Sequence, residues 1–470
     1  MPGLTNTGVA APSARLALWR HELAETVRLA LPMALTQLGQ VAMMTSDLAL
    51  LGRLGDDVVA AVSLAHTVLF GAFVLGMGLV SAVAPLAAQA FGARRPRLVR
   101  RSLRVGLWAA IILGVPLTMA QLHGFEILRA LGQPENAARI AARYLDGLAW
   151  SLVPAWWFIA LRSFMGAVNR PEPALWIMLA AIPANLVLAY VLIYGAFGAP
   201  KLDVLGAGIA TTLVNIGMCV AGVWIAYACR PFKKYRILGR FWRPDWPLMR
   251  QLLTIGVPMS GMFALEFGLF AAAALLMGLI GTTALAAHQI ALTVASIIFM
   301  VPMGIAMAAT VRVGQAAGRR EPQAAKVAGF VAIVIGGIFM VAMVVLVIAT
   351  RGLIPYAFLG VHGDHAATVA LASTLLLLGA SFFVADGVQV IAAGALRGLS
   401  DTRVPLLIAG ICFWAVGFTL SYGLGFTAGL AAPGIWIGLS AGLALYAVLL
   451  VWRFHALTRR NYLPETPAPV

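Results

Sequence analysis

The chain has 470 residues, of which 61% are hydrophobic and only 11% are charged, and its mean hydropathy is +0.93. A soluble domain carries about 25% charged residues, so this composition excludes a soluble globular protein. The formal net charge of +16 would suit a nucleic-acid-binding protein, but the basic residues lie mainly between apolar runs. We therefore expect membrane lipids, and not nucleic acid, as the partners of this charge.

Apolar runs recur along nearly the whole chain, and each is long enough for the about 20 residues that a membrane-spanning helix needs. In chain order we predict twelve spans, at residues 24–51, 57–91, 103–121, 138–163, 173–196, 205–229, 249–279, 283–311, 325–350, 368–396, 404–424 and 431–453. The predicted fold class is an all-α polytopic membrane protein with twelve transmembrane helices.

The basic residues gather on one side of these spans. With the N-terminus placed inside, all but six of the 33 Lys and Arg fall on the cytoplasmic side, and the six outer ones are Arg53, Arg129, Arg139, Arg143, Lys201 and Arg351. Positively charged residues are enriched in cytoplasmic loops. We therefore expect a multi-pass protein of a bacterial inner membrane with both termini in the cytoplasm.

The chain also contains a direct repeat. LALPMALTQLG at 29–39 resembles TIGVPMSGMFA at 254–264, and Pro32 aligned with Pro258 gives an offset of 226 residues. Farther on, SFMGAV around Gly166 resembles IAAGAL around Gly394 at an offset of 228. A direct repeat of six spans predicts two six-helix lobes of the same topology, related by an axis along the membrane normal.

Five segments follow from this repeat. We predict a cytoplasmic N-terminal segment 1–23, an N-lobe 24–229 with spans one to six, a basic cytoplasmic linker 230–248, a C-lobe 249–455 with spans seven to twelve, and a cytoplasmic tail 456–470.

Three carboxylates fall inside the apolar runs, namely Asp47, Glu266 and Asp386. A charge at bilayer depth costs about 2.5–3.5 kcal/mol, and such residues commonly mark ion or proton pathways. Asp47 precedes Arg53 by six residues, so an alternative role for it is that of a polar residue at the outer edge. For the two deeper acids the alternative is hydrogen bonding between helices. Gln389 shares a helix face with Asp386 and could orient the carboxylate or help to ligate a cation.

The segments SDLALLGRLG, VPMSGMFALEFGLFA, AAHQIALTVASIIFMVPMGIAMAATVRVGQAAG and ADGVQVIAAGALRG occur in this order along the chain. Together they resemble the NorM-like branch of the multidrug and toxic compound extrusion (MATE) family, over roughly residues 24–455. The resemblance implies a two-lobe exporter of cationic amphipathic compounds, driven by exchange for sodium ions or protons. It assigns cation coupling to Asp47, Glu266 and Asp386, the same residues that their position in apolar runs selects.

The resemblance also raises the question of which ion is coupled. Asn185 matches the first of two polar positions in a family stretch, but Ala189 occupies the second, so we expect the main coupling site in the C-lobe. Some relatives have a tyrosine where Phe299 stands, and its missing hydroxyl favours protons over sodium. Asn185, Gln389, Phe267 and Phe299 are candidate ligands of the cation or substrate, although phenylalanines in a helix often serve packing alone.

Other functions remain as alternatives. A flippase for a lipid-linked sugar would have a similar two-lobe fold, but it needs basic residues in its central cavity, whereas we expect the charges within the membrane to be negative. A membrane-embedded enzyme would need a nucleophile with a base or a cluster of metal ligands, and neither pattern is present, so we expect no enzyme activity. We expect no cofactor besides the coupling ion, no metal besides a possible Na⁺ at Glu266 and Asp386, and a monomer with cationic small molecules as substrates.

Overall fold

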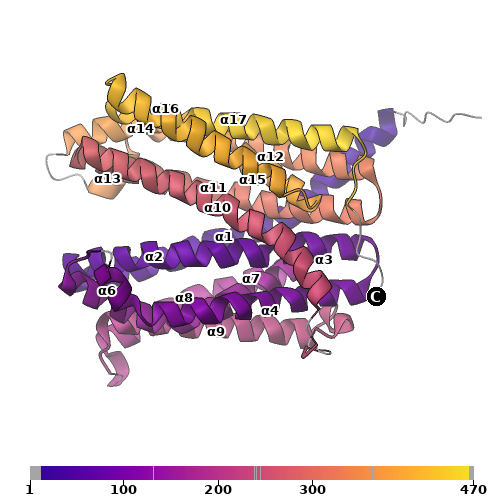
Figure 1. Ribbon diagram of the computed structural model, residues 1–470, viewed down its shortest axis with the longest axis horizontal. Coiled ribbons are helices and arrows are strands. Elements are labelled where there is room, and N and C mark those ends of the chain that lie inside the picture. The colour runs from indigo at the N-terminus through magenta and orange to yellow at the C-terminus, as the bar shows by residue number, and fades with distance from the viewer. Residues whose placement is uncertain are drawn as a thin grey trace, which may run out of the picture.

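The computed structural model describes residues 12–464, apart from residues 131, 199, 238, 240, 244 and 361–364. Within these residues the chain is helical and contains no strand, and the helices form two bundles that lie one above the other in Figure 1. By length and composition, eleven stretches of the described chain are able to cross a membrane. Helix α1 (Pro12–Leu51), in the first of the two bundles, is a twelfth long helix. The predicted all-α, two-lobe fold class is confirmed.

The first lobe is built from nine helices. They are α1, α2 (Asp56–Ser81), α3 (Val83–Gly92), α4 (Pro96–Gln121), α5 (Gly124–Ala130), α6 (Glu135–Leu148), α7 (Leu152–Ala167), α8 (Glu172–Tyr194) and α9 (Asp203–Ala228). Helix α1 begins twelve residues before the expected start of the first span, and residues 1–11 lie outside the described part of the chain.

The second lobe repeats this order. They are α10 (Trp246–Ile280), α11 (Thr282–Gly318), α12 (Pro322–Thr350), α13 (Ile354–Leu359), α14 (Ala366–Gly398), α15 (Arg403–Gly410), α16 (Thr419–Tyr422) and α17 (Ala431–Arg459), and the π-helical turns η5 (Ile411–Phe418) and η6 (Gly423–Thr427) join α15, α16 and α17.

The offset between equivalent helices of the two lobes changes along the chain. Helices α2 and α11, like α4 and α12, begin 226 residues apart, as the sequence repeat predicts. The offset rises to 231 where α7 ends at Ala167 and α14 ends at Gly398. The expected pairing of Gly166 with Gly394 was therefore wrong by three residues. The cause is that the chain from the start of α12 to the start of α14 is five residues longer than its N-lobe equivalent.

Two close helix crossings join the lobes, and the repeat relates them to each other. A Cβ atom added to Gly78 of α2 would lie 2.5 Å from the backbone of Ser260 in α10. A Cβ atom added to Gly304 of α11 would lie 2.5 Å from the backbone of Ala34 in α1. Each residue of the second crossing is 226 positions from its counterpart in the first. Small residues allow the helix backbones to approach this closely.

A second pair of crossings lies toward the C-terminal ends of α3 and α11. A Cβ atom at Gly92 would lie 2.1 Å from the carbonyl oxygen of Gln315, and one at Gly318 would lie 2.1 Å from that of Gln89. These are again equivalent positions of the repeat. No side chain fits between the two backbones at these positions, so the lobes meet here backbone against backbone.

The same two glutamines hydrogen-bond across the lobes. Gln89 donates from Nε2 to the carbonyl oxygen of Gly398 at 2.9 Å, and to Oγ of Ser400 at 2.8 Å. In the equivalent arrangement, Gln315 donates to the carbonyl oxygen of Ala167 at 2.9 Å and to Oδ1 of Asn169 at 2.8 Å. Each glutamine therefore satisfies polar groups at the end of a helix in the opposite lobe.

A buried ion pair reinforces this end of the molecule. Arg312 of α11 donates to both carboxylate oxygens of Glu22 in α1 at 2.8–3.0 Å, and both side chains are nearly inaccessible to solvent. Breaking a buried pair by removing one partner costs about 3–5 kcal/mol, because the other charge is left uncompensated. The first part of α1 is thus fixed to the C-lobe, although α1 belongs to the N-lobe by sequence.

The linker between the lobes packs on the N-lobe. Phe241 stacks on Trp108 with ring centroids 5.5 Å apart, and the indole of Trp108 donates to the Phe241 carbonyl oxygen at 3.0 Å. Asp245, at the N-cap of α10, forms a two-bond ion pair with Arg101 of α4. Burial alone would raise the pKa of Asp245, but the hydrogen bond and charge of Arg101 hold it below its ordinary value.

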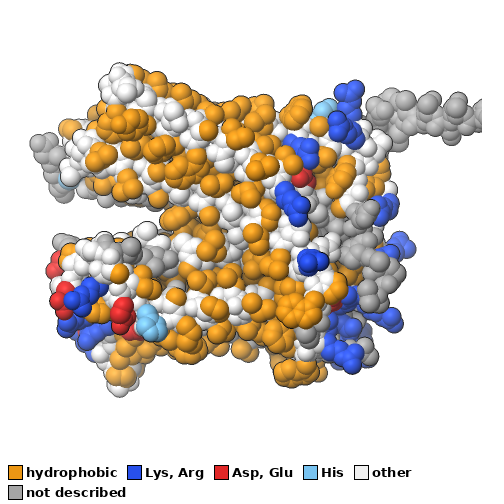
Figure 2. All heavy atoms as spheres, viewed as in Figure 1, with side chains coloured by type: hydrophobic (Ala, Val, Ile, Leu, Met, Phe, Trp, Pro, Cys, Tyr) orange, Lys and Arg blue, Asp and Glu red, His pale blue; other side chains and the backbone are white. Residues whose placement is uncertain are grey.

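At the opposite end the lobes separate. Figure 2 shows a notch between the two lobes at its left end, whereas Lys and Arg side chains gather at the right end, where α3 and the start of α10 lie. Helix α1 begins and α17 ends at this basic end (Figure 1). The molecule is therefore closed at its basic end and open at the other.

Adding a methyl group at Gly318 tests the backbone contact between the lobes at the closed end. We expect Gly318→Ala to lower the thermal stability of the purified protein, because its Cβ collides with a backbone oxygen that cannot move away alone, and overpacking of this kind costs about 1–3 kcal/mol. Gly337→Ala in α12 is the matched control, since its Cβ meets no atom within 4 Å and alanine favours a helix. Equal melting temperatures for the two variants would contradict the assignment.

Candidate functional site

The two deep acids of the C-lobe meet at one amide group. Nε2 of Gln389 donates to Oε1 of Glu266 at 3.0 Å and to Oδ1 of Asp386 at 3.2 Å. Asp386 and Gln389 lie three residues apart on α14, so they share a helix face, and Glu266 reaches them from α10. Asp386 is only 6% exposed and Gln389 only 3%. The structure thus brings together three residues that the sequence selected.

The packing of α14 explains why this site is buried. From Phe382 to Gly398 nearly every residue of the helix is buried, because α11, α12 and α17 surround it. Two carboxylates held against one amide group repel each other in such surroundings. Neutralising one of them with a proton or a bound cation relieves the repulsion, so the site is suited to capture a positive charge.

A buried cation lies near the same acids. Arg397, in the last turn of α14, is 7% exposed, places its guanidinium 5.5 Å from the ring centroid of Phe263, and interacts electrostatically with Glu266. The burial of Arg397 depends on the packing of α11, α12 and α17 around α14, which a single sequence does not display.

Aromatic rings extend from the acid site. Phe267 follows Glu266 directly and packs on Phe70 of α2, in the other lobe, with ring centroids 5.1 Å apart. Phe299 is partly buried on α11 against the main core. A further contact joins His288 to Trp436, whose indole donates to Nδ1 of the histidine at 3.1 Å. Phe267 is therefore the candidate that connects the acid site with the opposing lobe.

Asp47 occupies a separate site in the N-lobe. It accepts hydrogen bonds from Nδ2 of Asn185 and, at 3.1 Å, from the hydroxyl of Thr211 in α9. Asp47 is 5% exposed and Asn185 is fully buried, and Oδ1 of Asn185 has no hydrogen-bond partner among the described residues. Asp47 is therefore a buried hydrogen-bond acceptor within the N-lobe.

The sequence did not predict Thr211. It lies in GAGIATTLV, where a threonine within an apolar span carries little signal, and only the packing of α8 and α9 brings it to Asp47. The expected shortage of ligands at this site is thus partly offset, because a threonine hydroxyl from α9 stands beside the carboxylate, although Ala189 offers none.

Three arginines are buried as well, namely Arg162, Arg312 and Arg397, at 8%, 6% and 7% exposure. Arg312 pairs with Glu22, as described above. Arg162 makes no ion pair with any described residue and instead donates from Nη1 to Oε1 of Gln37 at 2.5 Å. Within the described chain, no three His, Cys, Asp or Glu residues lie close enough together to hold a metal ion.

Known proteins are similar in sequence to this chain along both lobes. The MatE family model matches residues 32–191 and 258–423, one stretch in each lobe. The chain is 62% identical to a probable multidrug resistance protein NorM of Rhodopseudomonas palustris, over 97% of each chain, and 56% identical to one of Bradyrhizobium diazoefficiens, over 93% of this chain and 94% of that one.

Solved structures agree with this match. The eukaryotic MATE transporter AtDTX14 superposes with a TM-score of 0.83 at 21% identity, covering 95% of this chain and 99% of that one, a likeness that concerns the fold. The relatives are transporters and not enzymes. The family model, the high identity over nearly the full length and the shared two-lobe architecture together show that this multi-pass membrane protein belongs to the MatE family of transporters, in its NorM-like branch.

Proposed function

We propose that this chain is a cation-coupled antiporter that exports cationic amphipathic drugs and toxic compounds. The observation that carries the proposal is the pair of buried acids, Glu266 and Asp386, held by Gln389 inside one lobe of a two-lobe bundle. The names of its relatives, which describe multidrug resistance proteins, support the same function.

Glu266 and Asp386 are the proposed coupling residues, with Gln389 as the group that positions them. When both acids are charged, the site attracts a cationic substrate. When an ion or proton neutralises one of them, the attraction weakens and the substrate is released. Asp47, with Asn185 and Thr211, is proposed as a second cation site in the N-lobe.

The rings near the acid site suit the proposed cargo. Phe267 and Phe70 meet across the two lobes beside Glu266, so a flat aromatic cation can lie against their faces while its charge points to the acid. A cation over an aromatic face gains about 0.5–2 kcal/mol. Phe299 is kept as a weaker candidate on the same grounds.

We favour protons over sodium as the coupling ion. Sodium prefers several oxygen ligands, but the nitrogen of the Gln389 amide, and not its oxygen, faces the two carboxylates. Phe299 offers no hydroxyl and Ala189 offers no polar atom. A proton needs only one carboxylate oxygen, which this site supplies twice.

The proposed location is the bacterial inner membrane, with both termini in the cytoplasm. Support comes from the Lys and Arg side chains that gather at the end where α1 begins and α17 ends (Figures 1 and 2). In this orientation the notch between the lobes opens outward. We propose that the protein works as a monomer whose basic end also contacts anionic lipid headgroups.

Neutral substitutions test the coupling residues. We expect Glu266→Gln and Asp386→Asn each to reduce gradient-driven export from proteoliposomes by about tenfold or more, because a coupling free energy of about 1.4 kcal/mol or more is lost with the charge. Glu135→Gln on α6 is the control, since the side chain of this glutamate is 70% exposed and its ion pair among the described residues is with its helix neighbour Arg139. Wild-type export by both variants at equal expression would refute the assignment.

Drug protection tests the substrate class. We expect a pump-deficient bacterium that expresses this chain to show raised minimum inhibitory concentrations for aromatic cations, because the buried acids attract positive charge. Uncharged compounds of similar size serve as the comparison. Protection restricted to anionic compounds would exclude the proposed cargo.

Equilibrium binding tests the choice of ion. A fluorescent cation should bind the purified protein more weakly as the pH falls, since a proton on either acid removes the attraction, and binding linkage requires substrate and proton to weaken each other equally. The titration is repeated with and without sodium. Weakening by sodium at constant affinity across pH would overturn the preference for protons, and affinity that responds to neither ion would exclude direct competition.

A further inference from the structure

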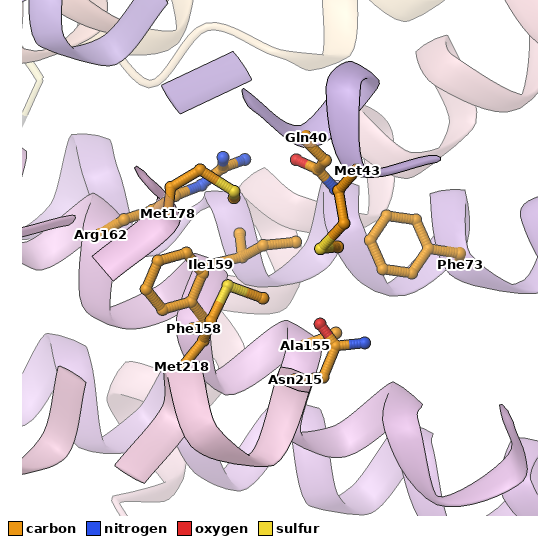
Figure 3. A pocket seen from close by; sticks show the side chains of 10 residues that line it. All are labelled: Gln40, Met43, Phe73, Ala155, Phe158, Ile159, Arg162, Met178, Asn215 and Met218. Atoms are coloured by element: carbon orange, nitrogen blue, oxygen red, sulfur yellow. The ribbon is translucent and has the colours of Figure 1, made fainter. Parts of the chain in front are cut away.

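The N-lobe contains a cavity at the position equivalent to the acid site of the C-lobe. Its walls come from α1, α2, α7, α8 and α9 (Figure 3). By the offsets given above, Gln40 of α1 corresponds to Glu266, while Ala155 and Phe158 of α7 correspond to Asp386 and Gln389. Both acids have thus been replaced by uncharged residues, and the lining includes Arg162.

Arg162 carries an uncompensated charge at this cavity. It is more than nine-tenths buried, and no carboxylate of the described chain lies within ion-pair distance of it. Its hydrogen bond goes to the neutral Gln37, and its Nε has no hydrogen-bond partner among the described residues. A buried guanidinium without an anion is costly, because desolvation removes the water that otherwise stabilises its charge.

The remaining lining limits what can bind. In Figure 3 the guanidinium of Arg162 and the amide of Gln40 lie at one end of the cavity and Asn215 lies at the other, with the thioethers of Met43 and Met218 between them. Amide groups donate hydrogen bonds to an anion, whereas the apolar walls offer nothing to a strongly hydrated or multiply charged one. The lining therefore fits one negative charge.

The size of the cavity limits which anions can bind. The centres of water-sized molecules can occupy about 30 Å³ within it. One water needs about 10–15 Å³ on this measure, so there is room for about two. A halide ion or a single carboxylate group fits this space, but a whole drug molecule does not.

We propose that this cavity is an anion site in which Arg162, assisted by Gln40 and Asn215, binds a small monovalent anionic group. The group is either a free anion such as chloride or the carboxylate of a zwitterionic cargo, and only the second source rests on the proposed export function. The two lobes would then bind opposite charges at equivalent positions, negative groups in the N-lobe and positive groups in the C-lobe.

The first arm of the test measures equilibrium binding of radiolabelled chloride to the full-length purified protein, without any transport step. We expect saturable binding that acetate displaces, that weakens about tenfold in Arg162→Gln, as a lost charge-assisted hydrogen bond predicts, and that Arg162→Lys largely retains. Arg139→Gln is the matched control, because it removes the charge of an arginine on α6 whose side chain is 65% exposed.

The second arm compares a rhodamine that carries a free carboxylate with its ethyl ester, which has the same cationic ring system. If the cargo supplies the anion, Arg162→Gln weakens binding of the acid about tenfold and leaves binding of the ester unchanged. Loss of the acid's binding without chloride binding supports the cargo source, whereas saturable chloride binding through Arg162 supports the free anion.

Two results would overturn the proposal. In the first, chloride does not bind saturably and Arg162→Gln affects binding of the acid and of the ester equally. In the second, chloride binds equally well to Arg162→Gln and to the wild type. If Arg162→Gln does not fold, Asn215→Phe fills the cavity and leaves the charge in place, and the same losses are expected. Failure of drug export with intact chloride binding would count against the proposed function alone.

Discussion

The backbone-to-backbone contact at the basic end is the constraint on which the rest of the structure depends. No side chain fits at Gly92 or Gly318, so α3 and the end of α11 are in direct backbone contact. Gln89 and Gln315 then bond helix ends across the lobes, and Arg312 pairs with Glu22 beside them. With the lobes joined there, they separate toward the other end, where the notch opens.

Internal symmetry explains why this contact is so tight. Each close crossing occurs twice, at positions related by the repeat, as when Gly78 meets Ser260 and Gly304 meets Ala34. A surface that meets its own equivalent needs only one set of small residues, which the repeat supplies to both lobes. Helices α1 and α10 cross between the lobes as a result, each packing partly on its own lobe and partly on the other.

The chemistry departs from this symmetry. Where the C-lobe has Glu266, the N-lobe has Gln40, and the acid of the N-lobe, Asp47, stands instead at a position that is Ala273 in the C-lobe. The shared scaffold therefore carries two different polar sites, an acid pair on α10 and α14 and a single acid bonded by Asn185 and Thr211. Such asymmetry allows the two lobes to bind different ions or different parts of one substrate.

The sequence by itself determined the class, the spans and the repeat of this protein, because these depend on hydropathy and spacing along the chain. It also selected Glu266, Asp386 and Gln389, since a carboxylate within an apolar run is conspicuous and a spacing of three shares a helix face. Only the tertiary structure decided that Thr211 reaches Asp47, that Arg162 is buried beside a cavity, and that Gly92 and Gly318 touch the opposite backbone. These contacts join residues far apart in the chain, so they depend on which helices pack together. Threonine and glycine are common in membrane helices, and a single sequence does not show which of them meet a partner.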